Sequence, residues 1–355
     1  MKTLQFNDYY ILLIFLINCY STWRLFFLYN SYDCSQHVLP TDLRKIKQVK
    51  KKPLVLNFLV FDWNLTILTL LTFFTFRGVT SSFWWNHFYL SSAACYCAYF
   101  LVSAKLVMLA CCFLNVFSAS KLSKDFFFAF SNISNFIPLL FFVANVFSFV
   151  IVLELCSISF YYKFITTQSK ATTINGTKSH KKPNTPFFNL IFFQYWASFF
   201  SSIFFFFFLG WLFYVCLTSD YSLISIIFNK LAVKGVLFEP MILFVFVFAF
   251  LFKLGLAPVH LFKLEVYKGL PLQSILFYTT FYFWGFYAAF IWFFINVLQF
   301  VANEWWIAIS LLLLAGGVYS LSLFFNVLAV KAFFAYSTIF NVFLFTVCIL
   351  ALKNI

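Results

Sequence analysis

The sequence predicts an all-α protein, built as a polytopic bundle of transmembrane helices. Of its 355 residues, 64% are hydrophobic and 10% are charged, whereas an ordinary soluble domain has about 25% charged residues. Apolar runs of roughly 20 residues, the length that a helix needs to cross the hydrocarbon core, recur along the whole chain. No stretch between them is long and polar enough for a soluble domain. The main surroundings of this protein are therefore expected to be lipid.

The apolar runs predict about ten membrane spans. We expect helices at residues 9–29, 54–76, 89–117, 126–145, 147–165, 187–217, 236–259, 271–298, 304–327 and 331–352. Only Lys2 precedes the first run, and no small-residue cleavage site follows it, so this run is expected to be a retained span and not a signal peptide. Pro138 interrupts the fourth span, which a membrane helix tolerates.

The basic residues are distributed as expected for a membrane protein. Most of them fall in the loops after the odd-numbered spans, including LRKIKQVKKKP and SKATTINGTKSHKKPNT. The positive-inside rule places these loops in the matrix or cytoplasm, so the net charge of +14 mainly reflects topology. No basic helix face with interleaved aromatics is present, and we expect no nucleic-acid partner. The 60 phenylalanines indicate an A+T-rich organelle genome, because lipid accepts Phe about as readily as Leu or Ile.

Cysteine and histidine spacing predicts no redox centre. Four of the nine cysteines share one expected helix without any C-x-x-C pair, and they are interpreted as small buried hydrophobes; they are Cys95, Cys97, Cys111 and Cys112. No two of the four histidines lie on facing spans at matching depth, as a membrane haem would need. The chain also has no Gly-rich phosphate loop. We therefore expect no metal, cofactor, flavin or iron–sulfur cluster in it.

Four charged residues within or near the expected spans are candidate functional residues, because an ionisable group at the bilayer centre costs several kcal/mol. Glu154, in SFVIVLELCSISFYY, is too short and too central to reach an interface easily, and its alternative is a protonated carboxyl bonded to a neighbouring helix. Lys105 is either a further relay or a side chain that snorkels along its own helix. Asp62 is interpreted as lying near the end of its span. The fourth is Lys253.

Lys253 precedes a predicted break in its helix. Gly255 and Ala257 allow a neighbouring helix to approach, and Pro258 leaves one helical carbonyl without its N–H partner. Broken backbone at membrane depth is tolerated where it is buried in protein or lines a hydrated cavity, so the lysine and the break together indicate an ion path. Burial disfavours the ammonium form and a nearby carboxylate favours it, so Lys253 paired with Glu154 could load and release a proton. The alternative is that Lys253 snorkels to the surface.

Three segments resemble motifs of one membrane-protein family. The stretch FKLGLAPVHLFKLEVYKGLPL is similar to the signature K-L-x-x-x-P-F-H-x-W-x-x-E/D-V-Y-x-G-x-P, IVLELCSISFYY resembles L-E-L-x-S-L-x-x-Y, and VLAVKAFFAYSTIF resembles K-R-L-L-A-Y-S-S-I. These signatures belong to subunit 2 of respiratory complex I, the proton-pumping NADH:ubiquinone oxidoreductase. The resemblance covers about residues 126–352, in the order of the family.

The resemblance assigns roles residue by residue. It implies that Glu154 is the proton-path glutamate of the fifth helix and that Lys253 is the central lysine of a broken seventh helix. His260 then matches the histidine at the end of that helix. Glu265 and Lys331 match the acid of the next loop and the basic residue before A-Y-S, and are further relay candidates.

Two departures from the family pattern stand out. The next-helix lysine of the family falls at Phe283, and the stretch LFYTTFYFWGFYAAF offers no basic substitute. The chain also stops after the tenth expected helix, where the family continues with about four more. We therefore expect a subunit split between two genes, with a separate chain supplying the C-terminal helices. Within this chain we expect a three-helix segment at 1–125 and the antiporter-like core at 126–355.

The expected function is that of a membrane-arm subunit of the NADH:ubiquinone reductase, multi-pass in the mitochondrial inner membrane. It would contribute proton translocation, with no redox centre of its own, and its partners would be the lipid bilayer, other membrane-arm subunits and the complementary half. Two alternatives stay open: a degenerate scaffold subunit of the same complex, for which Phe283 would be a symptom, and a component of a cation/proton antiporter.

Overall fold

The computed structural model describes most of the chain beyond the first expected span. The described residues are 20, 60–71, 81–83, 87–113, 124–174, 185–232, 238–256, 259–270, 275, 277–297, 299–325, 327 and 329–352. Apart from Tyr20, the expected helix at 9–29 lies outside them.

The prediction of an all-α bundle is confirmed, and the number of helices roughly matches the number of expected spans. The elements are a helix Val60–Leu71, strands β1 Ser81–Phe83 and β2 Phe88–Leu90, and helices α3 Ser92–Phe113, α4 Lys124–Phe142, α5 Val146–Ile174, α6 Thr185–Cys216, α7 Tyr221–Ala232, α8 Phe238–Leu254, α9 Leu261–Gly269, the π-helix η1 Tyr278–Phe283, α11 Trp284–Val297, α12 Gln299–Phe324 and α13 Val330–Leu352. Each expected span from residue 54 onward contains a helix in its described part.

Two of these helices and the antiparallel β1–β2 hairpin were not expected from the sequence. The helices are α7 and α9, with 12 and 9 residues, which are too short for the span criterion to find. Within the described residues, two helical segments are long and apolar enough to cross a membrane, at Ser92–Cys111 and Phe192–Cys216, and several apolar helices are shorter.

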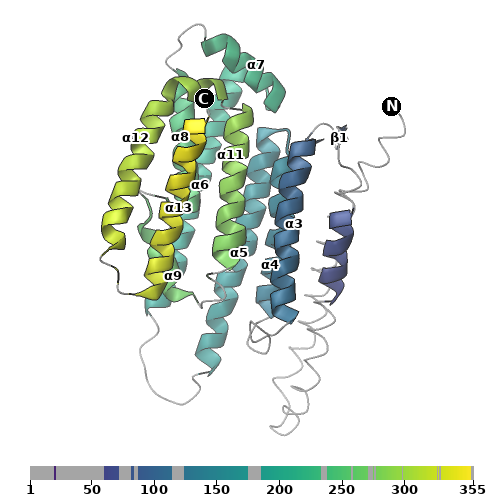
Figure 1. The fold of residues 1–355 in the computed structure, drawn as a ribbon, viewed down its shortest axis with the longest axis vertical. Helices are drawn as coiled ribbons and strands as arrows, with labels where there is room; N and C mark the ends of the chain where they lie inside the picture. Colours follow the sequence, from purple (N-terminus) through teal and green to yellow (C-terminus); the bar gives the residue numbers. More distant parts are fainter. Residues whose placement is uncertain are drawn as a thin grey trace. The chain divides into compact units, whose positions relative to one another are not determined.

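The chain divides into two compact units. Unit 1 comprises Met1–Val143 and Ile158–Lys170, and unit 2 comprises Ala144–Ser157 and Ala171–Ile355. In unit 1, α3 packs against α4, and the two run side by side in Figure 1. Ser91 caps α3, because its Oγ accepts a hydrogen bond from the backbone N–H of Ala94 at 3.1 Å. The helix thus begins three residues after the expected start of its span, just after the hairpin.

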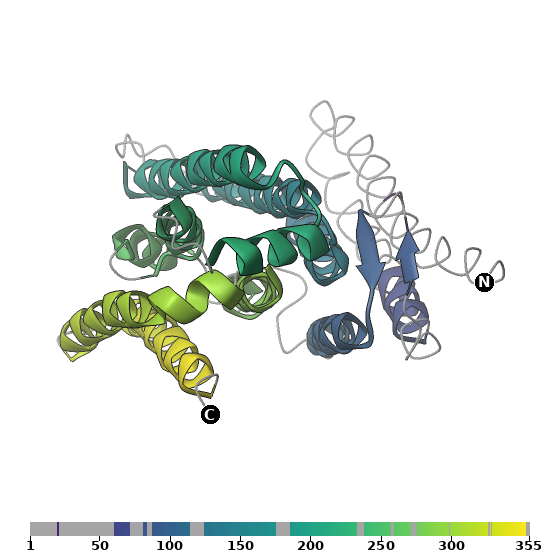
Figure 2. The same cartoon turned by 90° about the horizontal axis from the view of Figure 1, so that it is seen from above.

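The most extensive helix packing in unit 2 joins α6 to α8 and α12 to α13, and both pairs lie side by side in Figures 1 and 2. Its core is aromatic: the rings of Phe205 and Phe250 are 5.1 Å apart and those of Phe246 and Phe293 are 4.6 Å apart. The run of five phenylalanines follows the helical period, since Phe205 is buried and Phe206 is 63% exposed. Only part of this run therefore contributes to the core, and the rest faces outward.

The helix that carries Lys253 is broken, as the sequence predicts. α8 ends at Leu254, earlier than expected, because Gly255 adopts a left-handed φ of +62°. The N–H of Leu256 then bonds back to the carbonyl of Leu251 at 3.1 Å, which is the pattern of a glycine-terminated Schellman cap. The sequence assigned the break to Pro258, which lies outside the described residues. In the described part, Gly255 ends the helix through its positive φ. The sequence analysis interprets this glycine only as a site where a neighbouring helix can approach.

Candidate functional site

The first buried charge pair joins α5 to the last turn of α8. Nζ of Lys253 lies 2.9 Å from Oε1 of Glu154. The lysine side chain is 0% exposed and the glutamate side chain is 29% exposed, so the accessible part of the pair is the glutamate. The structure thus brings together the two residues that the sequence paired. It excludes the alternative in which Lys253 snorkels to the surface.

Two serines of α6 complete this site. Ser202 donates a hydrogen bond to Oε1 of Glu154 at 3.0 Å, and Nζ of Lys253 donates to Oγ of Ser198 at 3.5 Å. The backbone carbonyl of Ser198, 2.9 Å away, is a second acceptor for the single hydroxyl proton of Ser202. The hydroxyls support a carboxylate next to an ammonium, because they offer polar contacts without charge. Sequence reasoning did not single out either serine, because isolated serines are common in apolar helices.

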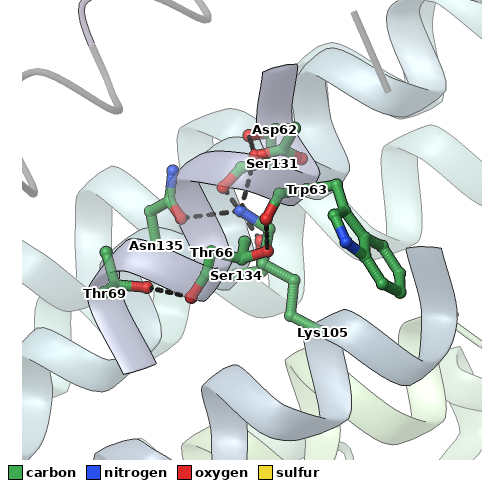
Figure 3. A network of polar contacts seen from close by, with 8 residues as sticks. All are labelled: Asp62, Trp63, Thr66, Thr69, Lys105, Ser131, Ser134 and Asn135. Atoms are coloured by element: carbon green, nitrogen blue, oxygen red, sulfur yellow. Dashed lines mark hydrogen bonds and ion pairs between the residues drawn. The ribbon is translucent and has the colours of Figure 1, made fainter. Parts of the chain in front are cut away.

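A second buried charge pair lies in unit 1. Nζ of Lys105, on α3, donates to Oδ1 of Asp62 at 2.8 Å and to Oδ1 of Asn135, on α4, at 3.0 Å. Ser131 donates to the same aspartate oxygen at 3.2 Å. Figure 3 shows the lysine side chain extending from α3 to these three polar residues. The side chains of Lys105 and Asp62 are 0% and 1% exposed, so Lys105 does not snorkel.

The structure gives Asp62 partners that the sequence interpretation did not include. Asp62 lies close to the first residue of the described helix Val60–Leu71, and it belongs to a buried network that spans three helices. Its second oxygen, Oδ2, is also buried and accepts no hydrogen bond from any described residue. One sequence signal points to such a network. Lys105 lies in an apolar segment and Asn135 in another expected span, and a polar group buried in a span needs a polar partner.

His260 is buried at the start of α9, where it occupies the N-cap position. Its ring lies 5.5 Å from the ring of Tyr319 and 6.0 Å from that of Tyr336, centroid to centroid. The histidine expected at the end of the broken helix is therefore enclosed by α9, α12 and α13 and does not reach solvent.

The other two relay candidates make contacts at the surface. Glu265 pairs with Lys268, one turn away on α9, at 2.7 Å, and their side chains are 44% and 56% exposed. Lys331 donates from Nζ to the backbone carbonyl of Leu270 at 2.8 Å and to that of Lys268 at 3.3 Å. Lys331 thus satisfies carbonyls at the C-terminal end of α9, as a basic residue after a helix often does.

Sequence reasoning missed one residue of this region, Lys263. It was counted as a loop lysine, yet it is 0% exposed, and its Nζ lies 3.3 Å from the ring centroid of Phe283. Helical spacing is the signal that finds it: Lys263 shares one face of α9 with Val266, Tyr267 and Leu270, and all three are buried. The position where the resemblance implies a lysine is therefore occupied by Phe283. The ammonium of Lys263, from α9, lies over the ring of that phenylalanine.

Within the described ranges, no group of three or more His, Cys, Asp or Glu side chains is placed to hold a metal ion. The chemistry available at the two pairs is the gain, transfer and loss of protons. Each pair couples one amine with one carboxylate, and each has hydroxyl or amide groups beside it.

Two solved structures share this fold. A chain of the respiratory complex I from Thermus thermophilus with bound aureothin is 16% identical, with a TM-score of 0.62, over 94% of this chain and 62% of that chain. A chain of the membrane-bound sulfane sulfur reductase, an archaeal respiratory membrane complex, is 15% identical, also with a TM-score of 0.62, over 94% of this chain and 49% of that chain. This similarity establishes the fold, and the chain spans about half to two thirds of the length of these two neighbours.

One curated protein is similar in sequence, an uncharacterized mitochondrial protein named ORF4 from Paramecium tetraurelia. It is 42% identical over 82 residues, which make up 23% of this chain and 46% of that protein. No protein-family model matches the chain.

Proposed function

We propose that this chain is an antiporter-like membrane-arm subunit of a proton-translocating NADH:ubiquinone oxidoreductase in the mitochondrial inner membrane, and that it corresponds to subunit 2. The observation that carries the proposal is the ion pair of Lys253 and Glu154 beside the break in α8. Two similarities support this location and complex. The chain shares its fold with a chain of respiratory complex I, and a relative in sequence is a mitochondrial protein. Residues 126–355 would form the antiporter-like core, and 1–125 an N-terminal three-helix segment.

The geometry gives the pair a way to move a proton. When Glu154 is ionised, its carboxylate supports the buried ammonium of Lys253 across 2.9 Å. A proton that arrives at Glu154, whose side chain is 29% exposed, cancels that charge and leaves the ammonium without its counter-ion. The ammonium then releases its proton, because a buried cation without a partner is disfavoured. Transfer of the proton from Glu154 to the neutral amine of Lys253 restores the carboxylate and the ammonium, so one proton enters and one leaves in each cycle.

The remaining residues take graded roles in this proposal. Lys105 and Asp62 form a second buried pair of the same kind and are assigned as a further relay. His260, buried at the start of α9, is assigned to the path beyond Lys253. Glu265 and Lys331 are relay candidates from the family resemblance, but their contacts at the surface of α9 favour a structural role.

The test is Lys253→Met in the native membrane. This substitution keeps most of the length of the side chain and removes the charge, and we expect an assembled complex whose proton uptake per NADH oxidised is reduced. The matched control is Lys230→Met, because Lys230 is an exposed lysine in the last turn of α7. Unchanged proton uptake in the assembled Lys253→Met complex would instead favour a scaffold subunit.

The scaffold remains the second candidate because one observation favours it: a neutral ring, Phe283, occupies the place of an expected lysine and is 0% exposed. The proposal also includes a separate chain that supplies the C-terminal helices of the subunit. Crosslinking of the intact complex tests this part. The expected product joins α12 or α13 to a second hydrophobic chain, and crosslinks only to other, complete subunits would contradict it.

A further inference from the structure

Lys263 is a buried lysine with no anion beside it among the residues that the structure describes. Its side chain is 0% exposed, and among the described residues its Nζ has neither a hydrogen-bond acceptor nor an ion-pair partner. The group that it does contact is the ring of Phe283, 3.3 Å from Nζ to the ring centroid. An ammonium above an aromatic face is attracted by the ring quadrupole, and the attraction is strongest where water is excluded.

The backbone next to Lys253 fixes the position of this lysine. A Cβ atom added to Gly255 would lie 3.1 Å from Cβ and 3.3 Å from Cδ of Lys263, so the aliphatic stem packs directly on the glycine that ends α8. Gly255 follows Lys253 by two residues. The helix break thus brings the stem of a second lysine against the turn that follows the first.

The ring contact differs chemically from an ion pair. When a lysine that is paired with a carboxylate loses its proton, a buried anion remains without its partner, and that state is disfavoured. When Lys263 loses its proton, a neutral amine remains above a neutral ring, and no buried charge is left behind. A proton on Lys263 is therefore easier to release than one on a tightly paired lysine, while the ring still favours its return.

The contact also lies at an irregular point of the backbone. Phe283 is the last residue of the π-helix η1, which leads directly into α11. Single π-helical turns occur often at functional sites, because they shift side chains away from the positions that a regular helix would give them. Phe283 is 0% exposed, so its ring is enclosed together with the lysine.

We propose that Lys263 is a second proton-exchange site of unit 2, distinct from the Glu154–Lys253 pair. Its amine accepts one proton, holds it as an ammonium over the ring of Phe283, and releases one proton to return to the neutral amine. No electron transfer or covalent step is involved. The inference rests on the proposed function, because a proton-exchange site has a role here only if the chain translocates protons.

The experiment uses the intact complex in its native membrane with three variants. In Lys263→Met, which keeps most of the stem, we expect the rate of proton uptake to fall by about a hundredfold, the lower end of what a proton-transfer group contributes. Lys263→Arg, which stays charged but cannot be deprotonated, should be equally deficient. Wild-type proton uptake in an assembled Lys263→Met or Lys263→Arg complex would overturn the proposal.

Phe283→Leu keeps the inference testable if the lysine variants fail to assemble. This change keeps an apolar side chain and removes the quadrupole that favours the ammonium. The sign follows: without the ring, the proton is lost at lower pH. The alkaline limb of proton uptake should therefore move down by about one to two pH units. An unchanged limb would indicate that Lys263 only fills the core.

Lys253→Met, measured in parallel, separates the two proposals. If Lys253→Met lowers proton uptake and the variants at 263 and 283 do not, only the inference about Lys263 fails. If none of the variants changes proton uptake, the proposed function fails as well.

Discussion

The buried network around Lys105 makes a quantitative prediction. Asp62→Asn removes the carboxylate and leaves an ammonium that is 0% exposed, whereas Lys105→Met removes the ammonium and leaves a carboxylate that is 1% exposed. Removing one partner of a buried ion pair costs about 3–5 kcal/mol, because the remaining charge has no counter-ion. Each single substitution is therefore expected to lower the free energy of unfolding by several kcal/mol.

The remaining contacts set the order of the two effects. After Asp62→Asn, Oδ1 of Asn135 still accepts from Lys105 at 3.0 Å, so we expect a loss near the lower end, about 3 kcal/mol. After Lys105→Met, the contact that Asp62 keeps among the described residues is the hydroxyl of Ser131 at 3.2 Å, and the loss should be larger.

The double variant distinguishes an ion pair from two independent polar groups. With both charges removed, the loss should be smaller than in either single variant, so the coupling energy is expected to be about 3 kcal/mol or more. The assay is unfolding of the purified chain in mixed SDS–detergent micelles, followed by circular dichroism, with Lys230→Met as the exposed control. Additive effects of the two substitutions would refute the reasoning.

Three further predictions concern unit 2. Gly255→Ala is expected to lower the free energy of unfolding by more than about 1 kcal/mol, because φ is +62° and the new Cβ would lie 2.8 Å from the ring of Phe262. The control is Gly210→Ala, where no atom lies within 4 Å of the new Cβ, and this change should be neutral or slightly stabilising. Equal thermal stability of the two variants would contradict this prediction. Ser202→Ala removes a 3.0 Å hydrogen bond to Glu154, worth about 1.5–3 kcal/mol for a charged acceptor, so proton uptake should fall about tenfold while quantitative blotting shows a normal amount of complex. Lys331→Met removes the 2.8 Å bond to the end of α9 and should lower thermal stability by about 1 kcal/mol without changing the ratio of protons to electrons, and a changed ratio would return this lysine to the relay.

The sequence predicts the Glu154–Lys253 pair well because both charges lie in apolar helices, where each of them needs a partner. The same reasoning finds Lys105, but its partner Asp62 lies 43 residues away on another helix, and no local pattern shows which helices pack together. Spans of about 20 residues are also predicted well, since membrane thickness sets their length.

The sequence is a weaker guide where chain segments are short or polar. Lys263 lies in FKLEVYK, where three charges in seven residues suggest a loop, yet the segment folds as α9 and buries this one charge. Gly255 was interpreted through packing alone, because a positive φ depends on the backbone and has no sequence signal beyond glycine itself. The domain boundary at 125/126 and the roles of the site residues remain predictions.

The break in α8 also has an electrical consequence. A helix carries roughly half a positive charge at its first turn and half a negative charge at its last. An unbroken span would place both ends near the membrane surfaces, but here α8 ends next to Lys253 and α9 begins at His260. The interruption thus creates a negative pole beside an amine and a positive pole beside an imidazole, both within the buried interior. The helix-end field is therefore of opposite sign at the two residues, negative at Lys253 and positive at His260.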